Sequence, residues 1–301
     1  MRGLLSGAVL SLLASQARAD PAGEARFDAI VRPTGFSGAI LVRKDDVLLF
    51  DKAYGLADAT TGKPNRPSTS FHVGTLSMRY TAVAILHLAE THKLSLDNLA
   101  GQFVTGLEPP LANATIRALA ALPPDAPQAA AAYETLAKVA AADTGKTFEE
   151  VTDAAAFGTV WMAGSGLDDG SHAGESRMAK GYSHTEEAPV TADWAALTGA
   201  ASAFTTTRDE LHWLDMVFGD GLLTAQSRAM LAAAPAGYGW SHGARYGGDA
   251  WWASGSAPGF ASYVMHVPAT GLTVIVLGNS DLPVAGLGDA LAAEAVAGSG
   301  R

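Results

Sequence analysis

The chain has 301 residues, of which 48% are hydrophobic and 17% are charged, and it contains no cysteine. This composition is that of a globular chain with a substantial apolar core, not of a disordered one. The net charge of −10 has the wrong sign for a protein that binds nucleic acid or an anionic membrane. The lack of thiols excludes disulfides, thiol catalysis and cysteine metal sites.

The first 19 residues have the pattern of a secretory signal peptide. Arg2 precedes an apolar run from Gly3 to Ala14, and small residues at Ala17 and Ala19 favour cleavage before Asp20. The run is shorter than the roughly 20 residues that cross a bilayer, although an uncleaved N-terminal anchor is the alternative. Cleavage removes two arginines and leaves 18 basic against 30 acidic residues, a net charge of −12. We therefore expect an exported protein whose single domain covers residues 20–301, with no membrane span after cleavage.

Strand-like runs lie near both ends of the chain. Ser37–Arg43 and Val47–Gly55 are joined by a short polar turn, which favours a hairpin. Three further runs, Asp249–Gly255, Phe260–Val267 and Gly271–Asn279, are separated by turn residues. Strands at both ends with helices between them predict one sheet built from about residues 37–56 and 248–279.

Helical patterns fill most of the chain between these strands. Leu76–His92 is apolar on nearly every side, which is typical of a core helix. An alanine-rich stretch from Ala112 to Asp143 is interrupted at Leu122–Pro127, and Thr205–Phe218 has acidic residues in its first turn. Another alanine-rich helix follows the last strand. The patterns predict an α/β (α+β) fold, with an antiparallel sheet flanked by helices and a trimmed helical region at about residues 72–235.

The order and spacing of several segments resemble those of the serine β-lactamase and penicillin-binding-protein-like superfamily, and most of all its class C and esterase branch. The similarity runs from about residue 37 to residue 280. The segments that carry it are GLADATTGKPNRPSTSFHVGTLSMRYTAVAILHLAETHKLSLD, ATIRALAAL, TGKTFEEV, AKGY, GAASAFTTTRDEL, GYGW, PGFASY and TGLTVIVLGN. The resemblance implies a serine-hydrolase fold, and a periplasmic or secreted location is common among its members.

The chemistry of that superfamily needs a serine nucleophile and, one helical turn later, a lysine that takes its proton. In this sequence the matching positions hold Thr75 and Met78. A threonine still needs a base, and methionine cannot accept a proton. Loss of general-base assistance typically slows a reaction by about 10²–10⁴-fold. A threonine here favours a helix N-cap, and a methionine favours core packing.

The two other catalytic motifs implied by the resemblance are also altered. The tyrosine of the second motif is matched by Gln128. The basic residue of the third motif, on a strand beside the nucleophile, is matched by Ala253. Gly255 of that motif is kept, and a glycine there lets another backbone approach closely. Each motif has therefore lost its ionisable member.

Ser77 is the fallback nucleophile. On a helix it is rotated about 200° from position 75, so a shifted helix start would be needed to bring it into the same site. The predicted ligand groove contains Trp252, Ser254, Gly255 and Ser256. Adjacent residues of a strand face opposite sides, so Trp251 and Trp252 should divide between the core and the groove or solvent.

No cofactor or metal site is predicted. The eight histidines are scattered and no H-E-x-x-H motif is present. We expect a catalytically inactive binding or regulatory protein, and the resemblance implies a cell-wall peptide, a small molecule or a protein partner as its ligand. The alternative is an active β-lactamase, esterase or D-Ala-D-Ala peptidase that uses Thr75 or Ser77. A third hypothesis is a decaying copy without a selected role.

Overall fold

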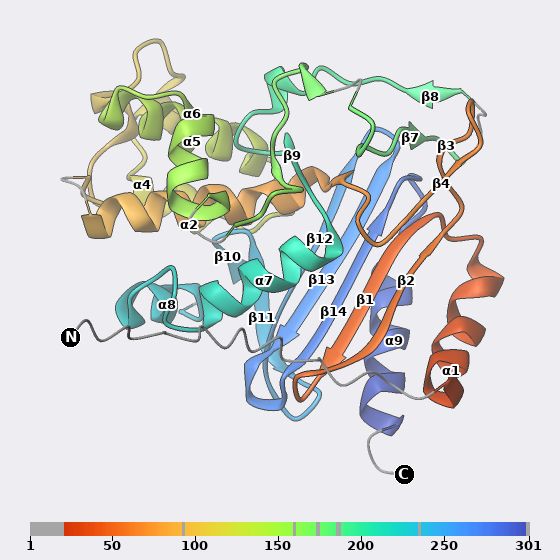
Figure 1. Ribbon diagram of the computed structural model, residues 1–301. Helices are drawn as coiled ribbons and strands as arrows, with labels where there is room; N and C mark the ends of the chain where they lie inside the picture. The colour runs from red at the N-terminus through yellow and green to blue at the C-terminus, as the bar shows by residue number, and fades with distance from the viewer. Residues whose placement is uncertain are drawn as a thin grey trace, which may run out of the picture.

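The computed structural model describes residues 21–91, 94–158, 161–172, 175–184, 188–233 and 236–298. The predicted signal peptide lies outside these ranges. A seven-stranded antiparallel sheet with the strand order β10-β11-β12-β13-β14-β1-β2 forms the centre of the molecule (Figure 1). Its strands are β1 (Gly38–Lys44), β2 (Val47–Tyr54), β10 (Ala236–Gly237), β11 (Trp240–Arg245), β12 (Gly248–Ala257), β13 (Phe260–Val267) and β14 (Leu272–Gly278).

The sheet joins the two ends of the chain. Strand β1 pairs antiparallel with β14, so that Gly38 lies opposite Gly278 and Leu41 opposite Ile275. Strands β1 and β2 form a hairpin whose turn residues, Asp45 and Asp46, both have positive φ angles. Two successive residues in this conformation match the right-handed twist of a tight hairpin. The predicted sheet from both ends of the chain is confirmed.

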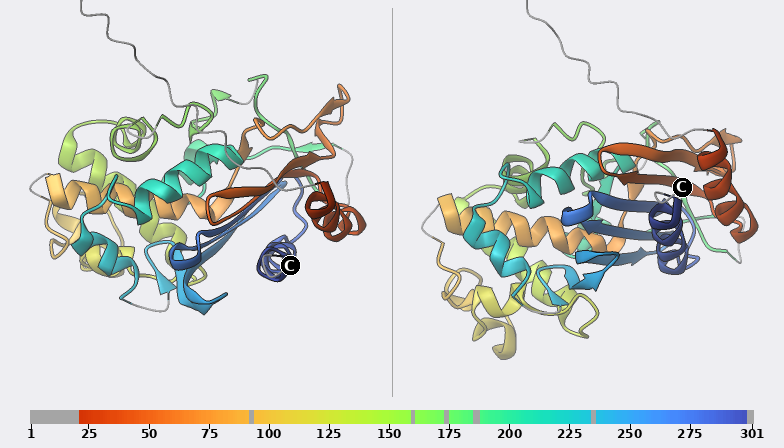
Figure 2. Two further views of the ribbon diagram at one scale, coloured as in Figure 1. Left: turned by 60° about the horizontal axis from the view of Figure 1, so that its bottom comes forward. Right: turned by 90° about the horizontal axis from the view of Figure 1, so that it is seen from below.

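Helices cover both faces of the sheet. Helices α1 (Pro21–Val31) and α9 (Ala285–Gly298) lie on one face, and the remaining helices lie on the other or beside it (Figure 2). Strands β13 and β14 are buried along their whole length. A strand covered on both faces must be apolar on both, which explains its nearly continuous hydrophobic sequence.

The second face carries the helical region and the larger apolar cluster. Its central element is α2 (Ser77–Thr91), in which every residue from Ser77 to Leu86 is buried. The other helices there are α3 (Pro109–Ala112), α4 (Ile116–Ala120), α5 (Ala129–Thr144), α6 (Phe148–Thr152), α7 (Thr207–Phe218) and α8 (Ala225–Leu231). Helix α7 begins after Thr206, whose hydroxyl accepts a hydrogen bond from the Asp209 N–H. Helix α5 ends at Gly145 in the left-handed conformation.

Short strands connect the helical region to the sheet. They are β3 (Leu56–Asp58), β4 (Lys63–Pro64), β5 (Phe71–His72), β6 (Gly166–Leu167), β7 (Gly181–Tyr182), β8 (Pro189–Val190) and β9 (Ala203–Thr205). Strands β5, β9 and β6 form a small sheet of their own, which carries the chain into α2.

The structure corrects the predicted limits of the sheet. The C-terminal part of the sheet begins before residue 248, because β10 and β11 also belong to it. The predicted helical region also contains the short strands β5 to β9. Strand β11, WSHGAR, was missed because only one of its six residues, Trp240, is a strong strand former. In the described part of the chain, every helix is too short or too polar to span a membrane.

Candidate functional site

The residues matched to the first and third catalytic motifs meet where a 3₁₀ turn, Gly74–Leu76, packs against β12. A Cβ on Gly255 would lie 2.7 Å from the Leu76 nitrogen and closer still to the Val73 carbonyl oxygen. Gly74 has a φ of +57°, and a Cβ there would overlap the Ser256 carbonyl. Two glycines therefore allow backbone-to-backbone contact and hold Thr75 beside the end of β12.

Thr75 does not cap a helix, contrary to prediction. It lies within the 3₁₀ turn, and α2 begins two residues later at Ser77. Thr75 is partly exposed, and its hydroxyl donates an exposed hydrogen bond to the Ser254 carbonyl oxygen at 3.5 Å. The tight packing of this turn against β12, which local sequence does not encode, directs the side chain toward the strand and away from the helix amides. No side-chain base forms a hydrogen bond with this hydroxyl in the described residues.

The positions matched to the proton-accepting residues are apolar or distant. Met78 and Ala253 are 1% and 5% exposed, and both belong to the apolar core. Gln128 is exposed at the N-terminal end of α5. No described hydrogen bond joins it to Thr75 or Ser254. The structure thus brings Thr75 and Ser254 together but supplies no ionisable partner from these positions.

Ser77 is already engaged by the protein backbone. Its buried hydroxyl donates to the Gly74 carbonyl oxygen at 2.7 Å and accepts a hydrogen bond from the Ala203 N–H at 3.0 Å. These bonds tie the start of α2 to the small sheet. A hydroxyl with both functions used inside the core is a structural group and is poorly placed to attack a ligand.

The four residues of the predicted groove lie along β12, but Gly255 is buried against the turn and is not open to a ligand. Strand β11 pairs with β12 only as far as Trp252, so the following residues have one edge without this neighbour. Ser254 and Ser256 are exposed along that part of β12. Trp252 instead packs with the apolar cluster near α1 and α9, and the Arg245 guanidinium lies 3.9 Å from its ring centroid. Trp252 therefore faces away from α2, whereas Trp251 packs on the α2 side.

A buried cluster next to this site was not predicted from sequence. His72 Nε2 lies 2.8 Å from Asp168 Oδ2, and the Trp194 ring stacks on the imidazole with ring centroids 3.7 Å apart. Burial lowers the pKa of His72, and the hydrogen bond between its imidazole and the Asp168 carboxylate only partly offsets this effect. His72, Asp168 and Trp194 come from three separate segments. Their contact therefore depends on tertiary structure, and no local sequence pattern reveals it.

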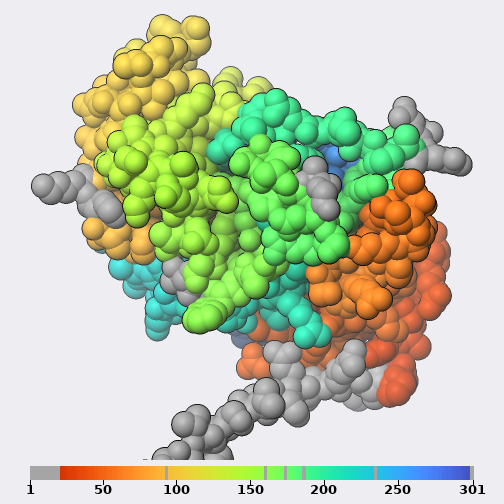
Figure 3. Space-filling model, turned by 45° about the horizontal axis from the view of Figure 1, so that its top comes forward, coloured from red at the N-terminus to blue at the C-terminus, as the bar shows by residue number. Residues whose placement is uncertain are grey.

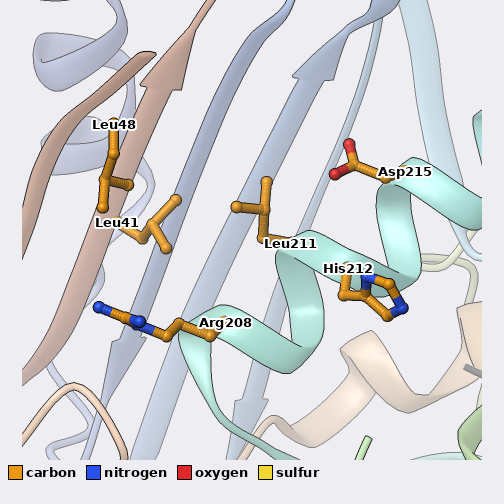
Figure 4. A pocket seen from close by; sticks show the side chains of 6 residues that line it. All are labelled: Leu41, Leu48, Arg208, Leu211, His212 and Asp215. Atoms are coloured by element: carbon orange, nitrogen blue, oxygen red, sulfur yellow. The ribbon is translucent and has the colours of Figure 1, made fainter. Parts of the chain in front are cut away.

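A small hollow between α7 and the β1–β2 hairpin is a weaker candidate. It has a volume of about 180 Å³ and is lined by Leu41, Leu48, Arg208, Leu211, His212 and Asp215 (Figure 4). Asp215 is bound by Arg43, and Arg208 pairs with Asp51. The hollow is smaller than the roughly 300–1,000 Å³ of typical ligand pockets, and its charges are already paired.

The arrangement of sheet, turn and core helix is that of a known family. The β-lactamase family model matches residues 27–298, which is most of the chain. The chain therefore belongs to the β-lactamase family.

Individual proteins similar to this chain include an esterase, a class C β-lactamase and a β-lactamase/D-alanine carboxypeptidase. Esterase EstB of Burkholderia gladioli is 31% identical over 91 residues, which make up 30% of this chain and only 23% of that enzyme. A β-lactamase/D-alanine carboxypeptidase from Pseudomonas syringae superimposes with a TM-score of 0.75 at 16% identity, over 93% of this chain and 99% of the other. A class C β-lactamase from Rhodobacter sphaeroides gives a TM-score of 0.71 at 20% identity, over 88% and 95%. These low identities establish the fold alone.

Proposed function

We propose that the protein is a non-catalytic member of the β-lactamase family that binds a ligand along the exposed end of β12. The observation that carries the proposal is the burial of Met78 and Ala253 in the apolar core. Acyl transfer by a hydroxyl requires a base within about 3 Å. Thr75 has the Ser254 carbonyl oxygen as its hydrogen-bond acceptor instead, and a carbonyl oxygen does not take up a proton at neutral pH.

The proposed ligand is an extended peptide of the kind found in cell walls. The end of β12 beyond Trp252 is not covered by β11, and an exposed strand edge pairs readily with an extended chain. Ser254 and Ser256 add two uncharged hydroxyls at this edge. The neighbours that act as D-alanine carboxypeptidases support a peptide over other ligands. Export is part of the proposal and is supported by the pattern of residues 1–19.

A comparison of hydrolysis rates tests the lack of catalysis. The purified protein and its Thr75→Ala variant are assayed with a chromogenic cephalosporin and with a p-nitrophenyl ester. We expect the same residual rate from both proteins, because Thr75 has no base to activate it. A wild-type rate more than about tenfold above that of Thr75→Ala would overturn the proposal, since base assistance is worth about 10²–10⁴-fold.

A binding measurement tests the proposed binding of a peptide at β12. A peptide ending in two D-alanines is titrated into the wild type and a Ser254→Glu variant, and the melting temperature is followed. We expect the peptide to raise the melting temperature of the wild type. The variant should respond less, because a new carboxylate repels the carboxyl end of the peptide. An equal response of the two proteins would place the ligand elsewhere.

A further inference from the structure

A second cavity lies at the end of the sheet where β3, β7 and the residues after β14 come together. It has a volume of about 610 Å³, within the range of small-molecule sites. Its lining includes Ser37, Leu56, Thr60, Tyr182, Asn279 and Ser280, none of which carries a charge. Figure 3 shows this face of the molecule, with the segment that contains β7 in green beside the orange β3–β4 region.

Tyr182 is held rigidly in the wall of this cavity. Its hydroxyl accepts a hydrogen bond from the Ala59 N–H at 2.8 Å. Its own N–H donates to the Gly259 and Asn279 carbonyl oxygens at 3.2 Å, and its carbonyl oxygen accepts from the Asp281 N–H. Both the backbone and the tip of the side chain are therefore fixed. A fixed aromatic ring binds a ligand without a further ordering cost.

The other lining residues differ in whether their polar groups are already hydrogen-bonded within the protein. The Asn279 amide is fully engaged, because it donates to the Leu56 and Lys180 carbonyl oxygens and accepts from the Ser37 hydroxyl. The Thr60 hydroxyl has no hydrogen-bond partner among the described residues. Leu56 is 41% exposed, which is unusual for a large apolar side chain in this protein. The cavity thus offers an aromatic ring, an exposed aliphatic group and a hydroxyl.

The charged side chains that the structure describes next to the cavity each have a partner. Asp58 pairs with Lys180 at 3.0 Å, and Asp281 pairs with His184 Nδ1 at 2.6 Å. The Lys180 pair lowers the pKa of Asp58 to about 2, so this carboxylate stays ionised and engaged. Asp58, Lys180 and Asp281, which the structure describes beside the cavity, therefore already have partners and are less available to a charged ligand. An uncharged ligand with an apolar face and hydroxyl groups is favoured.

We propose that this cavity binds a neutral sugar, with the C–H face of the sugar ring against Tyr182 and Leu56 and its hydroxyls toward Thr60 and Ser280. A sugar ring combines an apolar face with many uncharged hydrogen-bonding groups, which is the combination that the cavity presents. The cavity lies behind the turn between β12 and β13, because Tyr182 bonds to Gly259 in that turn. It shares none of its lining residues with the Thr75 site, so the inference stands independently of the proposed function.

Saturation-transfer NMR tests this assignment with cellobiose and N,N′-diacetylchitobiose, two neutral disaccharides, as the probes. Sorbitol, which has similar hydroxyls but no ring, is the matched control. We expect transfer to ring protons of at least one disaccharide and none to sorbitol. The Tyr182→Ala variant should lose the transfer, and Tyr182→Phe should retain it because the ring remains. No transfer to either disaccharide, or equal transfer with Tyr182→Ala, would overturn the proposal.

Two further variants keep the test decisive if Tyr182→Ala fails to fold. Thr60→Val removes the available hydroxyl on an exposed residue while preserving its shape. We expect it to weaken sugar binding by about two- to tenfold, the usual effect of one lost hydrogen bond. Ser254→Ala alters the other site and should leave sugar binding unchanged. Unchanged affinity in Thr60→Val together with a loss in Ser254→Ala would contradict the assignment and place the sugar at β12.

Discussion

We expect His266 to make the folded protein less stable as the pH falls. Its side chain is buried beside Phe218, and Nδ1 lies 2.9 Å from the Thr273 hydroxyl. Burial, with a contribution from the nearby Arg43 charge, lowers the pKa of His266 from 6.5 to about 4. The unfolded chain therefore binds a proton below pH 6.5 that the folded protein does not bind until about pH 4. The contribution of His266 to the free energy of unfolding is therefore fully present above pH 6.5 and decreases as the pH falls toward 4.

Urea unfolding at pH 7.5 and pH 4.5 measures this dependence. Between these values the free energy of unfolding should fall by roughly 2.5 kcal/mol through His266 alone. A His266→Asn variant keeps a polar group near Thr273, but this group does not titrate. Between the two pH values, the unfolding free energy of the variant should therefore fall by roughly 2.5 kcal/mol less than that of the wild type. Because other groups titrate equally in both proteins, the difference isolates His266. The same loss in wild type and variant would contradict the assignment.

Arg79 and Glu210 form an ion pair without solvent exposure. Arg79 Nη1 donates to Glu210 Oε1 at 2.7 Å, and Tyr80 donates to the other carboxylate oxygen. The guanidinium also lies 4.6 Å from the Trp240 ring centroid. Removing one partner of a buried pair leaves an uncompensated charge, and this loss is usually much larger than the gain from forming the pair.

We expect Glu210→Gln to reduce the free energy of unfolding by about 3–5 kcal/mol. The control is Asp97→Asn, which breaks the exposed pair between Asp97 and Arg117. That change should cost less than about 1 kcal/mol, because water screens exposed charges. Chemical denaturation measures both values. Similar small losses in the two variants would show that the buried pair has no special importance.

At the scale of elements, the contact between the 3₁₀ turn and β12 depends on Gly255. A methyl group there would overlap the Val73 carbonyl and approach the Leu76 nitrogen. Backbone atoms cannot move aside as a flexible side chain can, so Gly255→Ala should destabilise the protein by about 1–3 kcal/mol. Gly243→Ala on β11 is the control, since its Cβ would lie 3.5 Å from Trp252, an ordinary contact.

Thermal unfolding of the two alanine variants gives the comparison. The Gly243→Ala variant should melt within a few degrees of the wild type, whereas the Gly255→Ala variant should melt clearly lower. A Gly255→Ala variant as stable as the wild type would mean that the turn and β12 are not in close contact. The position of Thr75 would then need revision.

Element types could be predicted well where the sequence pattern is long. Helix α2 and strands β13 and β14 can be recognised from their long hydrophobic runs, which arise because each element is buried on several sides. Strands of two or three residues, such as β5 and β9, have no period to detect. Which of Trp251 and Trp252 faces α2 is set by the register of β12 with its neighbours, and adjacent residues alone do not reveal it.

At the scale of the whole molecule, the candidate site could be predicted only through family resemblance. Thr75 and Ser254 are 179 positions apart, and no local pattern predicts their contact. Their spacing matches that of the family's first and third catalytic motifs, and this match predicted that both residues lie beside one groove. Residues that the family's catalytic motifs do not include were missed, among them the His72–Asp168 pair and the cavity around Tyr182. Their contacts also join distant segments, as the 123-residue separation of Ala59 and Tyr182 illustrates.

We propose that Thr75 lies at the position matched to the family nucleophile and does not act as one. The most direct test is the intact mass of the protein after incubation with a fluorophosphonate and, separately, with a penicillin. A cooperative melt shows beforehand that the protein is folded, and Ser77→Ala serves as the matched variant. We predict an unchanged mass with both reagents. A one-to-one covalent adduct that maps to Thr75 would contradict the claim and establish an acyl-enzyme mechanism.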